Sequence, residues 1–405
     1  MNKTVYLKKG KEDSLRRFHP WVFSGAIART DDGLQEGDVV RVISSEGEFL
    51  GVGHIQVGSI AVRILSFHDV PIDEDFWRSR LLAAWNLRKS IGVYRPQAGG
   101  SSDAAPTFTN TTFRLVHGEG DNLPGLVIDC YGATAVMQAH SVGMHQSRLA
   151  IAKALKDVMG DNVENVYYKS ETTLPFKANL GQENGFILGD PTDNNVTIEN
   201  GLRFHVDWLK GQKTGFFIDQ RENRALLEHY AHGRTVLNMF CYTGGFSVYA
   251  LRGGASEVHS VDSSAKAVEL TNANVAINFP NDNRHEAYCE DAFKYLDSHD
   301  DKYDLIILDP PAFAKHRGAL RNALKGYTRL NVKGLQRIRH GGILFTFSCS
   351  QVVSQEHFRQ AVFTAAAQSG RKVRILHQLH QPADHPINIY HPEGEYLKGL
   401  VLYVE

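Results

Sequence analysis

The sequence predicts an α/β protein whose C-terminal half is built on a parallel β-sheet, preceded by a β-rich module and a small α+β region. Three observations predict this fold class. From Arg221 onward, continuous apolar strands alternate with helices, as in a parallel sheet covered on both faces. In the first 70 residues, glycine turns separate short β-branched runs. Between these regions, residues 113–190 mix strands with a helix.

The composition is that of a globular protein that folds compactly. The 405 residues are 42% hydrophobic and 22% charged, which is enough chain for two or three domains with real cores. Lys and Arg number 44 against 45 Asp and Glu, so any charged partner has to be recognised by a local patch. The charged N-terminus lacks the apolar core of a signal peptide, and no segment reaches the roughly 18 apolar residues of a membrane span. We therefore expect a cytoplasmic protein with no membrane partner.

Cysteine and histidine spacing predicts neither disulfides nor a metal site. Four cysteines lie far apart, without the C-x-x-C pairs of a zinc site or the density of a disulfide scaffold, so we expect them to be reduced. No metal-ligand spacing links the histidines, for which we expect solvated or core positions. Those considered are His285, His340, His357, His385 and His391.

The first two regions contain mostly strands and one clear helix. Residues 1–70 have β-branched runs at 37–55 and 58–67 and no long helix. A polar, proline-bearing join follows, and then a predicted amphipathic helix over residues 76–92. Its apolar positions are Phe76, Leu81, Leu82, Trp85 and Leu87. The Gly/Ala/Ser/Thr-rich stretch 97–112 has no apolar period and predicts a surface loop.

The C-terminal region begins with a predicted hairpin and continues as the α/β domain. Asn200-Gly201 is the turn signal of a hairpin over residues 196–208. We place the domain boundaries at residues 1–70, 71–195 and 196–405. The expected strands of the last domain are residues 235–240, 257–262, 303–309, 342–348, 371–379 and 398–405.

Ligands of an open α/β sheet bind beyond the carboxyl ends of its strands, where this sequence has glycines and acids. Gly244 and Gly245 let the backbone approach a ligand closely, although packing alone also uses such turns. Asp262 ends the next strand and can accept both hydrogen bonds of a ribose diol. Asp291 is either the partner of an adenine amino group or a helix cap.

Asp309 ends the most apolar strand and is followed by Pro310 and Pro311. The two prolines remove two backbone donors and fix φ, which predicts a stiff, non-helical exit whose carbonyls face the cleft. An acid at the end of a buried strand is costly unless it is used. The sequence therefore predicts a functional site at Asp309.

The predicted cofactor is a nucleoside without phosphates. A nicotinamide enzyme would also use a ribose acid, but the G-x-G-x-x-G fingerprint for pyrophosphate is missing and only paired glycines are present. S-adenosylmethionine is a nucleoside joined to a charged amino acid, and it needs no phosphate cradle. It fits these motifs better.

The combined motifs resemble class I S-adenosylmethionine-dependent ribosomal RNA methyltransferases of the PUA-containing RlmI type. The resemblance rests on "KTGFFIDQREN", "NMFCYTGGFSVYAL", "VDSS", "EDAF", "LDPPAFAK" and "FSCS". It covers almost the whole chain, because "YLKKGKEDSLRRFHPWVFSGAI" resembles the PUA domain and "HGEGDNLPGLVIDCYG" the middle domain of that family. In this family Cys241 stands where serine is common, and the 97–112 loop is longer than usual.

The resemblance implies a Rossmann-like methyltransferase domain that makes 5-methylcytosine in 23S ribosomal RNA, with S-adenosylmethionine as cofactor. It implies that Cys349 of the "SCS" motif is the nucleophile. We expect Asp309 to be its catalytic partner. The resemblance further implies that the cofactor or target pocket is lined or bordered by Gln220, Arg221, Asn238, Tyr242, Gly244, Asp262, Asp291 and Asp309.

Cytosine chemistry explains why a thiol is needed. Carbon 5 is too weak a nucleophile to take a methyl group from a sulfonium, but addition of a thiolate to carbon 6 makes the ring an enamine. We expect the serines beside Cys349 and nearby backbone donors to favour the thiolate. Asp309 is expected to bind nitrogen 3 and the amino edge. The base that removes the carbon-5 proton is not identified, and Cys349 alone would also suit a small buried hydrophobe.

RNA contacts are expected along a basic segment. Residues 315–339 hold eight basic and no acidic residues, and their basic side chains recur every four residues beside an apolar stripe. The N-terminal segment adds a second basic group, with aromatic residues for stacking or core packing. It contains Lys3, Lys8, Lys9, Lys11, Arg16 and Arg17, with Phe18, Trp21 and Phe23.

Two other functions stay open at this point. A guanine or adenine nitrogen methyltransferase on ribosomal RNA would need Asp309 and the prolines but no thiol. An RNA-binding assembly factor with a vestigial cofactor site would need neither the thiol nor the Asp309 motif. A nicotinamide oxidoreductase is a remote third alternative, and the oligomeric state, including a homodimer, is not readable from the sequence.

Overall fold

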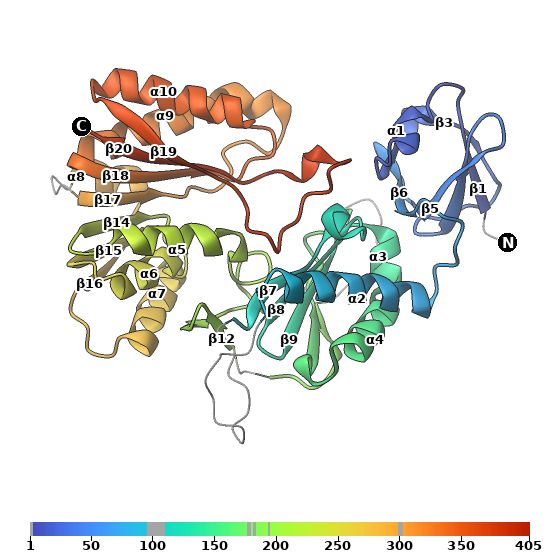
Figure 1. Ribbon diagram of the computed structural model, residues 1–405, viewed down its shortest axis with the longest axis horizontal. Coiled ribbons are helices and arrows are strands. Elements are labelled where there is room, and N and C mark those ends of the chain that lie inside the picture. The colour runs from blue at the N-terminus through green and yellow to red at the C-terminus, as the bar shows by residue number, and fades with distance from the viewer. Residues whose placement is uncertain (1–2, 95–109, 176–179, 181–183, 193–194, 299–302) are drawn as a thin grey trace. The chain divides into compact units, whose positions relative to one another are not determined.

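The computed structural model describes residues 3–94, 110–175, 180, 184–192, 195–298 and 303–405 (Figure 1). Of the predicted 97–112 loop, residues 97–109 lie outside the described residues. Contacts divide the chain into two compact units. The first comprises residues 1–201, 206–218 and 383–394, and the second comprises 202–205, 219–382 and 395–405.

The first unit begins with a six-stranded sheet in the order β2-β6-β5-β4-β1-β3. Its elements are β1 (Lys3–Leu7), α1 (Asp13–Arg16), β2 (Trp21–Phe23), β3 (Ile27–Thr30), β4 (Val39–Ile43), β5 (Phe49–Ile55) and β6 (Ile60–Ser66). Val5, Val40 and Val62 are fully buried between these strands. The predicted β-rich module without a long helix is confirmed.

A five-stranded sheet, β11-β10-β9-β8-β7, follows in this unit. Its elements are α2 (Glu74–Ser90), β7 (Thr112–His117), β8 (Leu126–Tyr131), β9 (Thr134–Ala139), α3 (Val142–Gln146), α4 (Arg148–Met159), β10 (Asn165–Tyr168) and β11 (Gly185–Leu188). Helix α2 confirms the predicted amphipathic helix. However, Leu82 is exposed, whereas Arg88 is buried and holds Asp121 in a bidentate ion pair.

The predicted hairpin forms strands β12 (Val196–Glu199) and β13 (Leu202–His205). Asn200 and Gly201 join them with φ values of 48° and 80°. Two successive positive φ angles are those of a type I′ turn, which the Asn-Gly pair favours. The local turn chemistry therefore determined this element.

The second unit contains a seven-stranded sheet in the order β16-β15-β14-β17-β18-β20-β19. Its strands are β14 (Thr235–Met239), β15 (Glu257–Asp262), β16 (His285–Cys289), β17 (Tyr303–Leu308), β18 (Ile338–Ser348), β19 (Val373–Leu379) and β20 (Lys398–Val404). Strands β14 to β18 are parallel, as predicted, whereas β20 runs antiparallel to both of its neighbours. Strand β16 was missed because, at the sheet edge, its half-exposed sequence HEAYC has no apolar run.

Helices cover both faces of this sheet (Figure 1). They are α5 (Arg221–Tyr230), α6 (Gly245–Arg252), α7 (Ala265–Asn278), α8 (Ala292–Ser298), α9 (Leu320–Arg337) and α10 (Gln355–Ser369). Buried side chains of the central strands pack under α8, α9 and α10, among them Leu237, Ile306 and Leu344. This core fixes where each strand ends and where the helix after it begins. In the described residues, the helices are too short or too polar to span a membrane.

Candidate active site

The strand order places a ligand-binding edge between β14 and β17. The chain passes from β14 to β15 on one side and reaches β17 on the other side of β14. Ligands of open α/β sheets bind beyond the carboxyl ends of the strands at such a switch point. Met239 pairs with Val261 and with Leu308, and the predicted acids Asp262 and Asp309 directly follow these two residues. The sheet register therefore brings both acids to one edge.

The loop after β14 has a strained backbone. Phe240, Tyr242 and Gly244 have φ values of 58°, 48° and 77°, in the left-handed region. Non-glycine residues in this region each cost about 1–3 kcal/mol and cluster at functional sites. A Cβ atom on Gly244 would lie 2.6 Å from Cγ2 of Thr271 in α7. Packing and backbone conformation therefore both require glycine here, and the approach of a ligand stays a prediction.

Asp262 is held by two backbone amides. Tyr242 N–H donates to Oδ2 at 3.0 Å, and Ser264 N–H donates to Oδ1 at 2.9 Å. A carboxylate has about four lone-pair sites, so both oxygens can accept a further hydrogen bond. The carboxylate is half-buried at the edge of the sheet. This geometry suits the predicted contact with a ribose diol.

Asp291 adopts the helix-capping geometry. It is exposed before α8, and its Oδ1 accepts hydrogen bonds from Phe293 N–H and Lys294 N–H, both at 3.0 Å. The capping alternative is therefore what the structure contains. A contact with an adenine amino group would have to use the other carboxylate oxygen and stays a prediction.

Asn238 lies inside the sheet and is only 1% exposed. Its Nδ2 donates to Ser247 Oγ at 2.8 Å, and that hydroxyl shares a hydrogen bond with Ser260. In the described part of the chain, Asn238 Oδ1 is buried without a hydrogen-bond partner. The amide is thus oriented by α6, and its place in the cofactor pocket stays a prediction.

Asp309 is oriented by an amide relay from α5. Gln220 Nε2 donates to Asp309 Oδ2 at 3.1 Å, and Asn223 Nδ2 donates to Gln220 Oε1 at 2.6 Å. Gln220 and Arg221 are both buried. Gln220 therefore positions the Asp309 carboxyl group, and its predicted place at the border of the cofactor pocket stays a prediction. Arg221 contacts Glu222 Oε1 at 3.3 Å.

The serines beside Cys349 do not favour a thiolate, contrary to the expectation from the sequence. Ser348 Oγ donates to the hydroxyl of Tyr327 at 2.9 Å, and Ser350 Oγ donates to the carbonyl of Ala314 at 2.6 Å. Both hydroxyl protons are therefore used elsewhere. The second bond joins the loop after β18 to the loop that contains the two prolines, so the serines position the thiol.

Tyr327 of α9 reports the proximity of the two predicted catalytic residues. Burial, together with negative charge at Cys349 and at Asp309, raises the pKa of this hydroxyl to about 12, against the lowering effect of its hydrogen bond with Ser348. Both groups therefore act on one hydroxyl. Cys349 itself is half-buried.

Lys398 is a site residue that the sequence analysis missed. It is 5% exposed, pairs with Ser348 across β18 and β20, and donates from Nζ to the carbonyl of Ser350 at 2.6 Å. Burial lowers its pKa to about 8, while Cys349 and Glu395 act in the opposite direction. A lysine that opens an otherwise apolar strand was the available signal.

The other cysteines lack such surroundings. Cys130 and Cys241 are buried, which raises the pKa of both thiols, that of Cys241 to about 12. The exposed Cys289 thiol contacts the carbonyl of Ser263 at 3.7 Å. The burial of Cys130 and Cys241 is that of structural cysteines, whereas the exposure of Cys289 differs from the structural role expected for it.

One group in the first unit has side chains of metal-binding type. His19, His391 and Glu393 place their ligand atoms within 4.8 Å of one another. However, His19 Nδ1 accepts a hydrogen bond from Trp21 N–H at 3.3 Å, which leaves the proton of a neutral ring on Nε2, facing Glu393 at 3.5 Å. A metal would need the Nε2 lone pair, so we assign no metal here.

Comparisons with known proteins agree with this geometry. A family model described as S-adenosylmethionine-dependent methyltransferase matches residues 171–388, and one described as a PUA-like domain matches residues 5–67. The chain is 40% identical to ribosomal RNA large subunit methyltransferase I of Alteromonas mediterranea, over 100% of this chain and 99% of that protein. The protein of that name from Tolumonas auensis is 39% identical over 99% of each chain.

Solved structures share the whole fold. A Streptococcus mutans protein assigned as a SAM-dependent methyltransferase matches with a TM-score of 0.82 over 100% of both chains, at 24% identity. A methyltransferase solved in complex with SAH matches equally well, with a TM-score of 0.82, 25% identity and full coverage of both chains.

The sheet, the loop after β14 and the matched models together define an S-adenosylmethionine-dependent methyltransferase with an N-terminal PUA-like domain. S-adenosylmethionine is its cofactor, and the Asp262 edge without a phosphate cradle fits that nucleoside. Within this class, the chain belongs to the family of ribosomal RNA large subunit methyltransferase I.

Proposed function

We propose that this protein methylates carbon 5 of a cytosine in 23S ribosomal RNA through a covalent adduct with Cys349. The observation that carries the proposal is that Asp309 and Cys349 directly follow the paired parallel strands β17 and β18 at one edge of the sheet, because a thiol and an acid at one place match this chemistry. Ribosomal RNA as the substrate class is supported by the names of the relatives and by the PUA-like domain. The same substrate agrees with the expected cytoplasmic location.

In the proposed reaction, the Cys349 thiolate adds to carbon 6 of the cytosine, and the π-electrons of the ring shift toward nitrogen 3. S-adenosylmethionine supplies the electrophilic methyl group that carbon 5 then accepts. A base removes the carbon-5 proton, and those electrons expel the thiolate and restore the ring. The target base has to leave its stack to reach Cys349, which costs a few kcal/mol and favours unpaired RNA.

Asp309 is proposed to bind the edge of the ring that gains charge. A carboxyl group can share a proton with nitrogen 3 and accept a hydrogen bond from the amino group. Gln220 holds the carboxyl group in place before the substrate arrives, which lowers the cost of ordering it in the transition state.

Lys398 is proposed to stabilise the thiolate. Its ammonium group is fixed on the carbonyl of Ser350, the residue after Cys349, and a neighbouring cation lowers the pKa of a thiol. This charge takes the role that the sequence analysis gave to the serine hydroxyls. A buried lysine is unfavourable for stability, so its presence at this position calls for a function.

Replacement of Lys398 by methionine is expected to lower kcat by about 10- to 100-fold and to raise stability at pH 7. Its pKa falls from 10.5 to about 8 on folding, which costs about 3 kcal/mol at pH 7. The variant also loses the hydrogen bond to Ser350, which lowers its stability by about 1 kcal/mol. We therefore expect its free energy of unfolding to exceed that of the wild type by about 2 kcal/mol.

The pH dependence tests this assignment. Between about pH 8 and pH 10.5 the unfolded chain binds more protons at Lys398 than the folded chain, so wild-type stability rises relative to the variant. Urea unfolding should show a smaller difference in stability between Lys398→Met and the wild type at pH 10 than at pH 7. Lys372→Met, at an exposed position, is the control. Wild-type kcat in Lys398→Met would remove Lys398 from the mechanism.

The modified nucleoside itself tests the proposed function. Ribosomal RNA is incubated with the enzyme and a methyl-labelled donor, digested, and analysed by mass spectrometry. We expect label only in 5-methylcytidine. Label in a methylated guanosine or adenosine would replace the proposal by a nitrogen methyltransferase, and absence of both donor binding and label would indicate an assembly factor.

A further inference from the structure

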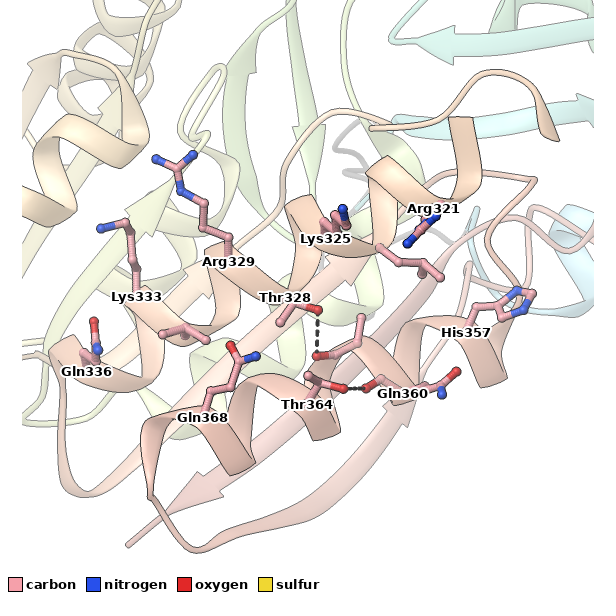
Figure 2. Close-up of a pocket in the computed structure, with 13 residues that line it drawn as sticks. Arg321, Lys325, Thr328, Arg329, Lys333, Gln336, His357, Gln360, Thr364 and Gln368 are labelled. Atoms are coloured by element: carbon pink, nitrogen blue, oxygen red, sulfur yellow. Dashed lines mark hydrogen bonds between the residues drawn. The ribbon is translucent and has the colours of Figure 1, made fainter. Parts of the chain in front are cut away.

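A groove runs between helices α9 and α10 on the outer surface of the second unit (Figure 2). Its volume is about 790 Å³. One wall is formed by α9 and the other by α10, and small and apolar residues such as Leu324, Val332 and Ala361 lie between them. Thr328 Oγ1 donates to the carbonyl of Ala361 at 3.3 Å, which holds the walls together.

The α9 wall is cationic. Arg321, Lys325, Arg329 and Lys333 line the groove at intervals of four residues, which spaces them by about 6 Å along the helix. Arg329 stacks over Phe293, and Lys333 contacts Asp297. Arg321 and Lys325 are exposed, and in the described part of the chain neither makes a hydrogen bond or ion pair. Two cations are therefore available to a ligand.

The α10 wall is polar and carries no acid. It presents His357, Gln360, Thr364 and Gln368 to the groove. In the described residues, the His357 Nδ1 atom is buried without a hydrogen-bond partner. Amides, a hydroxyl and an imidazole can donate to phosphate and to base edges alike. No lining residue of the groove is a carboxylate, and the neighbouring Asp297 is paired with Lys333.

The groove starts at the active-site edge. Helix α9 follows β17 and the Asp309 loop, and α10 follows β18 and Cys349. Both helices therefore begin at the carboxyl ends of parallel strands, where the site lies. Figure 2 shows Arg321 and His357 at that end of the groove, and Gln336 and Gln368 at the other.

We propose that this groove binds the sugar-phosphate backbone of the unpaired RNA strand next to the target nucleotide. The proposal rests on the proposed RNA methyltransferase function and adds to it the path of the strand. A stretched single strand fits such a groove because its phosphates can follow the cations while its bases face neutral amides. From Arg321 to Lys333 the helix rises about 18 Å, which is room for a few nucleotides.

The double variant Arg321→Gln/Lys325→Gln tests the groove. Each phosphate contact on a single strand contributes about 0.7 to the slope of log affinity against log salt, so two lost contacts lower the slope by about 1.4. At 0.1 M salt this corresponds to about 20-fold weaker binding. The probe is a labelled single-stranded RNA of about 20 nucleotides, titrated at several salt concentrations.

Matched variants separate the groove from general charge loss. Arg203→Gln/Lys372→Gln removes one arginine and one lysine that are exposed and lie outside the groove, and it should bind RNA as the wild type does. Gln360→Glu places one negative charge on the neutral wall and should weaken binding about fivefold. Calorimetry with S-adenosylmethionine should give wild-type affinity for all three variants, which confirms their folding.

The outcomes are independent of the cytosine chemistry. The proposed RNA path would be overturned if Arg321→Gln/Lys325→Gln kept the wild-type RNA affinity and salt slope. It would also be overturned if the Arg203→Gln/Lys372→Gln control lost as much RNA affinity. A methylated purine in place of 5-methylcytidine would overturn the proposed function. A lower salt slope in Arg321→Gln/Lys325→Gln would still support RNA binding in the groove. Weakened binding of a duplex but not of the single strand would also contradict the proposal.

Discussion

Replacement of Cys349 by alanine is expected to abolish methyl transfer, with a fall in kcat of about 10⁴-fold or more. Without the thiolate, carbon 5 of the cytosine keeps its low nucleophilicity, and no other group in the site supplies the missing electrons. The residue is half-buried at the end of β18, so the truncation removes little packing. The measurement is single-turnover methylation of ribosomal RNA, together with calorimetry to show that S-adenosylmethionine still binds.

Covalent trapping gives this prediction a second readout. RNA with 5-fluorocytidine at the target position cannot lose a proton from carbon 5, so the wild-type enzyme should remain attached to it after methylation. Cys349→Ala should form no such complex. Cys130→Ala is the control, because this thiol is buried in β8 and its pKa is raised. It should lose about 1 kcal/mol of stability and keep both activity and trapping. Wild-type activity in Cys349→Ala would exclude the covalent mechanism.

Replacement of Asp309 by asparagine is expected to lower kcat by about 10²- to 10⁴-fold. Asparagine keeps the shape of the side chain and can still donate to nitrogen 3 and accept from the amino group. It cannot share a proton with the ring as negative charge develops there. We therefore expect the loss in kcat with little change in KM for RNA, measured by steady-state methylation.

Asp304, in the strand β17 that ends just before Asp309, provides the control. Asp304 Oδ2 accepts hydrogen bonds from Thr235 N–H and from Arg339, and these contacts lower its pKa. Asp304→Asn should reduce stability and leave kcat unchanged, because it lies near the amino end of β17, whereas the site lies at the carboxyl end. An Asp309→Asn enzyme with wild-type kcat would show that the acid only binds the cofactor or holds Gln220.

Local sequence patterns predicted most of the elements because each depends on residues that are neighbours in the chain. The Asn200-Gly201 turn, helix α2 and the apolar strands β14, β15, β17 and β18 are of this kind. Strand β16 was missed because an edge strand buries few side chains and leaves no apolar run. The direction of β20 is set by pairing with β18 and β19, which a single-strand pattern does not report.

The residues of the candidate site also divide into those that local patterns predicted and those whose contacts only the fold determined. The sequence pointed to Asp262, Asp309 and Cys349, because each follows a strand whose apolar run is easy to read. It gave the serines beside Cys349 the wrong task, since a hydroxyl has several bonding directions and only packing selects Tyr327 and Ala314 as partners.

The sequence by itself determined the fold class and the short motifs at the strand ends, because these follow from local periodicity and from residue types at fixed spacing. Its resemblance to a known family indicated the family and supported the cofactor. Only the tertiary structure brought Lys398 beside Cys349, placed Gln220 on Asp309 and made a groove from two helices. Such contacts join residues far apart in the chain. Their partners are selected by burial and by strand register, which no local pattern encodes.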